Sequence, residues 1–104
     1  MEHVAFTMRL SPGCDEEYKK RHDEIWPELS KLLKENGFKD YSIFLDKQSN
    51  LLFGTFKITD KSVLNTLSEN PLMRKWWKYM SDITESTADQ LPVLTNLEEV
   101  FYLR

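Results

Sequence analysis

The spacing of apolar residues along this chain changes between the two periods that distinguish strands from helices. Over residues 4–10 every second residue is apolar, as in a strand with one buried face. Over residues 15–36 apolar residues recur three or four positions apart, as in an amphipathic helix. The chain is therefore predicted to combine strands and helices.

The first helical segment has one apolar side and one charged side. Its apolar arc contains Tyr18, His22, Ile25, Trp26, Leu29, Leu32 and Leu33. Pro27 removes a backbone hydrogen bond, so the helix is predicted to bend there. The bend either follows the curvature of a sheet or directs Tyr18, His22 and Trp26 into a pocket. Gly37 is predicted to end the helix as a left-handed cap.

The remaining elements are predicted from shorter patterns. They are strands at 41–46 and 51–58, helices at 61–68 and from 72 to about 83, a polar loop at 84–96 and a strand at 97–103. The polar connection at 47–50 has hairpin length, which predicts antiparallel pairing of the strands on either side. Asn70 and Pro71 separate the last two helices.

The order strand, helix, strand, strand, helix, strand predicts the ferredoxin-like arrangement of the α+β class. In it, a four-stranded antiparallel sheet carries helices on one face. The strand at 51–58 is apolar on both sides, with Leu51 and Phe53 on one and Leu52, Phe56 and Ile58 on the other. A bare apolar sheet face is too large a patch to leave in water. We therefore expect a symmetric homodimer through that face, the dimeric α+β barrel type.

Composition limits the functions available to the chain. Its 104 residues make a single domain, residues 1–104. A net charge of -3 with scattered basic residues disfavours nucleic acid as a partner. The lone Cys14 forms no internal disulfide, which favours a reducing compartment. There is no membrane-length apolar run and no secretory pattern at the amino terminus, so a soluble, cytoplasmic protein is expected.

His22 is the most informative candidate for chemistry because it lies at the centre of an apolar arc. An imidazole there needs a hydrogen-bond partner or a cavity. One interpretation is a core histidine bonded to a backbone carbonyl. However, Tyr18 and Trp26 lie one turn to either side, and they favour an aromatic pocket with a titratable centre.

The adjacent Trp76 and Trp77 form the second unusual cluster. On a helix they point about 100° apart, so one can pack in the core while the other lines a cavity. Flat aromatic rings with a polar group suit the apolar patches and hydroxyls of sugars. Core filling with one surface aromatic is the equal alternative.

Other chemistries have little support in the sequence. His3 and His22 have no partner at a metal-ligand spacing, so no metal is expected. Three glycines form no phosphate-binding loop and no dinucleotide motif, and no serine or cysteine is marked as a nucleophile beside a base.

Four segments of the chain match a known family: 18–29 (YKKRHDEIWPEL), 41–53 (YSIFLDKQSNLLF), 74–82 (RKWWKYMSD) and 97–103 (LEEVFYL). In these segments, and over nearly its whole length, the chain resembles the L-rhamnose mutarotase family. The resemblance implies a small dimeric α+β fold, no metal or organic cofactor, and interconversion of the α and β anomers of L-rhamnose. It also implies His22 as the proton-donating residue and Tyr18, Tyr41, Trp76 and Trp77 as sugar contacts. Segments 59–70 and 84–95 depart from the family pattern.

Mutarotation needs only proton transfers: the ring oxygen gains a proton while the anomeric hydroxyl loses one. His22 suits one transfer, while the second group stays open among Tyr18, another polar side chain and water. Three other functions remain: a cofactor-free oxygenase of similar fold, a non-enzymatic sugar-binding module, and a structural partner protein.

Overall fold

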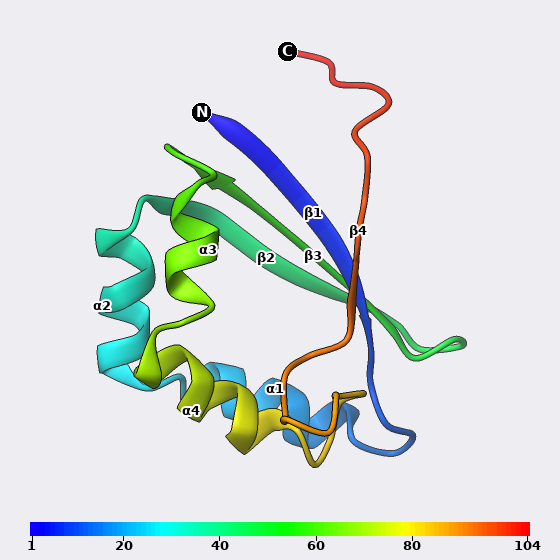
Figure 1. Cartoon of the computed structure of the whole chain (residues 1–104). Helices are drawn as coiled ribbons and strands as arrows, with labels where there is room; N and C mark the ends of the chain where they lie inside the picture. Colours follow the sequence, from blue (N-terminus) through cyan, green and yellow to red (C-terminus); the bar gives the residue numbers. More distant parts are fainter.

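A four-stranded antiparallel sheet with four helices on one face makes up the computed structural model, which describes residues 1–104 (Figure 1). In chain order the elements are β1 (Glu2–Arg9), α1 (Asp15–Asp23), α2 (Pro27–Glu35), β2 (Phe38–Asp46), β3 (Leu51–Ile58), α3 (Val63–Leu67), α4 (Pro71–Met80) and β4 (Leu94–Asn96). The strands lie in the order β2-β3-β1-β4. The α+β, ferredoxin-like prediction is confirmed. None of the helices is long and apolar enough to cross a membrane.

The centre of the sheet is the pair β1 and β3, which match along their whole length from Glu2 opposite Ile58 to Arg9 opposite Leu51. Every second residue of β3 is buried against the helices, as the alternation predicts. Gly54 is one of these, and a Cβ atom there would collide with the ring of Phe6. The missing side chain therefore lets the Phe6 ring lie across β3.

Helix α1 and helix α2 are separate, so the prediction of a single bent helix is wrong. Trp26 has φ -58° and ψ 129°, an extended conformation that stops the helix. The cause is Pro27, because a proline ring disfavours helical geometry in the residue before it. Pro27 itself becomes the first residue of α2. Gly37 has φ +88°, which confirms the left-handed cap.

The middle of the chain follows the predictions closely. Strands β2 and β3 form the expected hairpin, although β2 begins earlier, at Phe38. Helix α3 is shorter than the predicted helix over 61–68. The side chain of Asn70 accepts hydrogen bonds from the backbone N–H groups of Leu72 and Met73, which starts α4.

The carboxyl end differs from the prediction. The last strand, β4, lies inside the segment predicted as a loop, and residues 97–104 form no strand. After the N–H of Leu97 donates to the carbonyl of Ala5, the tail leaves the sheet (Figure 1). Val100 is 90% exposed and Phe101 is 77% exposed. The alternating pattern of this segment makes a strand only against a surface that buries one side, and the single chain offers none.

Candidate active site

A cleft of about 1180 Å³ lies between the sheet and the helices. Of the 34 residues that line it, 20 are hydrophobic. All five predicted site residues line this cleft: Tyr18 and His22 from α1, Tyr41 from β2, and Trp76 and Trp77 from α4. The cleft exceeds the usual small-molecule range of about 300–1000 Å³, so one monosaccharide would fill only part of it.

His22 has one ring nitrogen bonded to the backbone and the other available. Its Nδ1 lies 3.1 Å from the carbonyl oxygen of Tyr18. A carbonyl only accepts, so in the neutral ring Nδ1 carries the proton and Nε2 keeps its lone pair. Burial lowers the pKa of His22 from its ordinary 6.5, and the bond to Tyr18 offsets part of this effect. The ring therefore has the backbone bond of a core histidine while it also lines the cleft.

Two aromatic rings hold the imidazole in place. The Tyr18 ring lies 4.4 Å from the His22 ring at an angle of 32°. The Trp76 ring meets His22 edge-on at 5.4 Å and 89°. Trp76 is itself buried and packs edge-on against Trp26 at 5.0 Å. His22 is therefore confined between Tyr18 and Trp76, with its orientation set by both rings and by the backbone bond.

The two tyrosine hydroxyls of the cleft are neutral near pH 7. Burial raises the pKa of Tyr18 well above its ordinary value, and the nearby Tyr41 hydroxyl raises it further. Desolvation raises the pKa of Tyr41 to about 12, although 41% of the residue is exposed. Both groups are therefore phenols that donate and accept hydrogen bonds, and neither is a phenolate base.

A β-bulge places Tyr41 in the cleft. Lys39 pairs with Lys57 and Ser42 with Thr55, so Asp40 and Tyr41 together lie opposite one residue of β3. Asp40 takes the left-handed conformation with φ 52°. The Tyr41 ring then lies on the helix side of the sheet, among Phe6, Phe38 and Phe56. The only sequence signal for this bulge is the aspartate, a residue that tolerates left-handed geometry.

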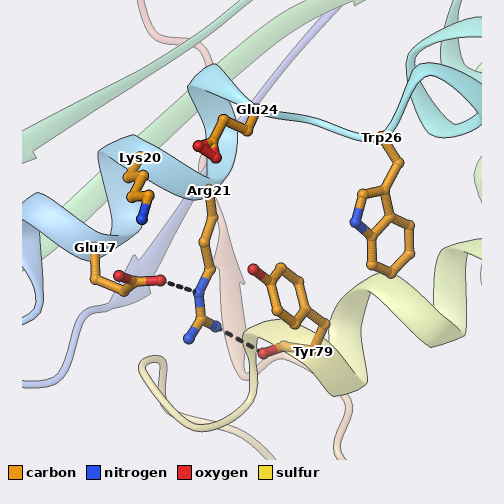
Figure 2. Close-up of a pocket in the computed structure, with 6 residues that line it drawn as sticks. All are labelled: Glu17, Lys20, Arg21, Glu24, Trp26 and Tyr79. Atoms are coloured by element: carbon orange, nitrogen blue, oxygen red, sulfur yellow. Dashed lines mark hydrogen bonds and ion pairs between the residues drawn. The ribbon is translucent and has the colours of Figure 1, made fainter.

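Trp26 lies outside the cleft, so the interpretation that directed it into a pocket with His22 is wrong for this residue. It packs on Tyr79 and lines a smaller hollow of about 270 Å³ on another side of α1 (Figure 2). Figure 2 also shows Arg21 reaching from α1 toward α4 across this hollow. No local pattern in the sequence marks Arg21, because its partners Tyr79 and Asp82 are distant in sequence.

The cleft offers proton transfer and apolar stacking. The Nε2 of His22 has a lone pair that can accept a proton, and two phenols and two indoles of the lining add polar or flat surfaces. No group of three or more His, Cys, Asp or Glu side chains lies close enough to hold a metal ion.

Comparison with known proteins places the chain in a family. The family model described as L-rhamnose mutarotase matches residues 3–103. An L-rhamnose mutarotase of Sinorhizobium fredii is 53% identical over 103 residues, which is 99% of both chains. The crystal structure of L-rhamnose mutarotase from Formosa agariphila superposes with a TM-score of 0.92 and 44% identity over 100% of both chains.

A more distant structure shares the fold alone. An antibiotic biosynthesis monooxygenase has a TM-score of 0.63 at 12% identity, over 96% of this chain and 99% of its own. It is similar in architecture, and at this identity the likeness does not extend to chemistry. The two L-rhamnose mutarotases, in contrast, match the whole chain at 44–53% identity, which is enough to assign the family. The chain therefore belongs to the L-rhamnose mutarotase family and is an isomerase that acts on a carbohydrate.

Proposed function

We propose that this protein interconverts the α and β anomers of L-rhamnose in the cleft, with His22 as the residue that transfers the anomeric proton. The observation that carries the proposal is the bond from Nδ1 of His22 to the Tyr18 carbonyl, which leaves Nε2 as a base in the cleft that both tryptophans line. The family of the chain supports the substrate.

Ring opening begins with neutral His22. Its Nε2 takes the proton of the anomeric hydroxyl, the bond between the anomeric carbon and the ring oxygen breaks, and the ring oxygen receives a proton. That second proton comes from the Tyr18 hydroxyl or from a water molecule beside it. The products are the open-chain aldehyde, an imidazolium and the conjugate base of the second donor, a Tyr18 phenolate or a hydroxide paired with the imidazolium.

Ring closure reverses these transfers on the other carbonyl face. After rotation about the bond next to the aldehyde, the sugar hydroxyl attacks the carbonyl carbon and gives its proton back to the phenolate or hydroxide left by the opening step. The imidazolium returns its proton to the carbonyl oxygen, so His22 is the base in opening and the acid in closure. This donation is the role that the family resemblance implies for the residue.

The other four residues bind the sugar in this proposal. Trp77 lies against the flat C–H side of the pyranose ring, and the buried Trp76 contacts the sugar at the wall of the cleft beside His22, where it excludes water. Tyr41 and Tyr18 hydrogen-bond sugar hydroxyls, which suits their neutral phenol groups. The mainly hydrophobic lining of the cleft suits the methyl group of a deoxy sugar.

The test is anomer exchange of L-rhamnose measured by saturation-transfer NMR with and without protein. The wild type should accelerate exchange, and His22→Ala should lose at least about a hundredfold, the usual scale of general acid–base catalysis. His3→Ala is the matched control, because His3 lies on β1, is half exposed and contacts Glu99 of the tail. Turnover near wild type in His22→Ala would remove His22 from the mechanism.

The same exchange experiment, together with a measurement of oxygen uptake, separates the remaining functions. A sugar-binding module would bind L-rhamnose without accelerating exchange. A cofactor-free oxygenase would consume oxygen with an aromatic substrate. The monooxygenase likeness supports only the fold, so oxygen uptake is not expected.

We also propose that the protein is a homodimer through the sheet face opposite the helices. This face carries Phe44, which is 64% exposed, and the half-buried Leu51 and Phe53. Val100, Phe101 and Leu103 of the tail are also exposed, and they enlarge the apolar surface that a partner subunit would bury. Light scattering should give twice the 12.4 kDa chain mass, and Phe44→Glu should give the monomer. A wild-type monomer at micromolar concentration would contradict this assembly.

A cytoplasmic location is the last part of the proposal. It is supported by the single free cysteine, Cys14, which leaves the fold independent of disulfides. Cell fractionation with an antibody against the native protein tests it.

A further inference from the structure

Arg21 joins helix α1 to the carboxyl end of α4 through several contacts at once. Its Nη1 donates to the carbonyl of Tyr79 at 2.7 Å and to Asp82 at 2.8 Å, and Nη2 donates to the other Asp82 oxygen at 3.2 Å. Its Nε donates to Glu17 at 2.7 Å. The guanidinium also holds the pKa of the Asp82 carboxyl below its usual value. Only 11% of the side chain is exposed, so this is a well-ordered, bidentate pairing.

No other side chain of α1 makes a hydrogen bond to α4 or to the turn after it. The remaining ion pair of α1 joins Lys19 to Asp23 within the helix. Arg21 therefore makes all of the side-chain hydrogen bonds that join α1 to this end of α4.

A continuous series of contacts leads from Arg21 to the site. The guanidinium carbon lies 4.4 Å from the centre of the Tyr79 ring. Tyr79 packs 5.6 Å from Trp76, and Trp76 meets His22 at 5.4 Å. Figure 2 shows the first part of this series, with Arg21 bonded to the Tyr79 carbonyl beside the ring. Arg21 and His22 are neighbours on α1 that point to different sides of the helix.

We propose that Arg21 is a positioning residue that holds α1 against α4, so that His22 keeps its place between Tyr18 and Trp76 relative to the sugar. This inference rests on the catalytic role proposed for His22. Catalysis is sensitive to such placement, since a displacement of about 1 Å can cost about a hundredfold in rate. Sugar binding depends less on it, because the tryptophan faces tolerate a small shift of the helix.

The test is Arg21→Lys, which keeps the charge and removes the bidentate fork. At a temperature where circular dichroism shows a fully folded protein, kcat for L-rhamnose exchange should fall about tenfold or more, with KM within about twofold. The matched control is Arg74→Lys on α4. Arg74 bonds only to Ser68 and Glu69, which lie just before α4, and makes no bond to α1. That variant should keep wild-type kcat.

A second measurement reports on placement without using activity. NMR titration of the His22 ring should show a higher pKa in Arg21→Lys than in the wild type, because a loosened helix pair admits water to the imidazole. The same titration in Arg74→Lys should match the wild type.

Two results would overturn the inference. One is a lowered melting temperature with unchanged kcat and unchanged His22 titration, which is the behaviour of a purely structural clamp. The other is a raised KM with unchanged kcat, which would assign Arg21 to binding. If His22→Ala retains wild-type turnover, the role of His22 fails instead, and the placement by Arg21 is then decided by the titration.

Discussion

The Nδ1 atom of His22 lies 3.1 Å from the carbonyl oxygen of Tyr18, one helical turn earlier on α1. This bond assigns the proton of the neutral imidazole to Nδ1 and leaves Nε2 with its lone pair, as the atom that we propose meets the substrate. Although His22 lies in an apolar arc, its Nδ1–H group has a hydrogen-bond acceptor and its Nε2 atom can accept a proton.

The pH dependence of kcat should follow the titration of His22. Burial lowers its pKa below the ordinary 6.5, and the active form in ring opening is the neutral ring. Exchange measured between about pH 5 and 8 should therefore fall on the acid side, with a midpoint below 6.5. A midpoint above 6.5, or a flat profile, would contradict this assignment.

Stability should also depend on this group. Because the pKa of His22 is lower in the folded protein, the unfolded chain binds protons more readily, and protonation favours unfolding. The free energy of unfolding should thus decrease as the pH falls below about 6.5, the unfolded value. Urea titrations at several pH values should show a smaller decrease in His22→Gln. An equal decrease in both proteins would assign the effect to other groups.

Trp77 is expected to supply sugar-stacking area in the cleft. Trp77→Ala should raise KM for L-rhamnose about tenfold or more, which corresponds to about 1.4 kcal/mol of binding free energy. Tryptophan fluorescence during sugar titration gives the affinity directly. Tyr102→Ala, in the exposed tail, should leave the affinity unchanged. An unaltered affinity in Trp77→Ala would exclude the stacking role.

Gly54 should tolerate no side chain. A Cβ atom there meets the Phe6 ring, so Gly54→Ala is expected to lower the free energy of unfolding by about 1–3 kcal/mol. Urea denaturation measures this loss. The double variant Gly54→Ala with Phe6→Leu should recover part of it, because the smaller side chain makes room. If the loss of unfolding free energy in the double variant equals the sum of the losses in the two single variants, the side chains at these positions do not collide.

The bulge at Asp40 should govern both stability and sugar binding. Asp40→Val forces a branched side chain into φ 52° and should cost about 1–2 kcal/mol, whereas Asp40→Gly should be tolerated. Asp40→Val should also raise KM, because the bulge holds Tyr41 in the cleft. Lys39→Val, at the neighbouring position of the same strand, is the control for the substitution itself. Equal effects at both positions would remove the special role of the bulge.

The order of elements and much of the site could be predicted from the sequence. The helical arc around His22 predicted that Tyr18 and His22 share a face, and the structure stacks their rings at 4.4 Å. Asn70 and Pro71 marked the start of α4, and Gly37 marked the cap after α2. These features depend on residues within one turn or one cap, so the local pattern determines them.

Other features depend on contacts between distant parts of the chain. Pro27 determines that Trp26 is extended, but the side of α1 to which the Trp26 ring turns depends on its packing against Trp76 of α4. The tail was predicted as a strand from its alternation, yet strand formation needs a partner surface that the single chain does not supply. Arg21 and Asp82 lie 61 positions apart, and no local spacing connects them.

The sequence by itself determined that this chain folds as strands and helices in a ferredoxin-like order, with His22 and Tyr18 on one apolar helix face. Periodicity and capping are properties of neighbouring residues, so they can be read locally. Only the tertiary structure decided that Trp76 meets His22, that a bulge places Tyr41 in the same cleft, and that Trp26 lies outside it. Those relationships come from how the sheet and helices pack, and packing depends on side chains brought together from distant positions.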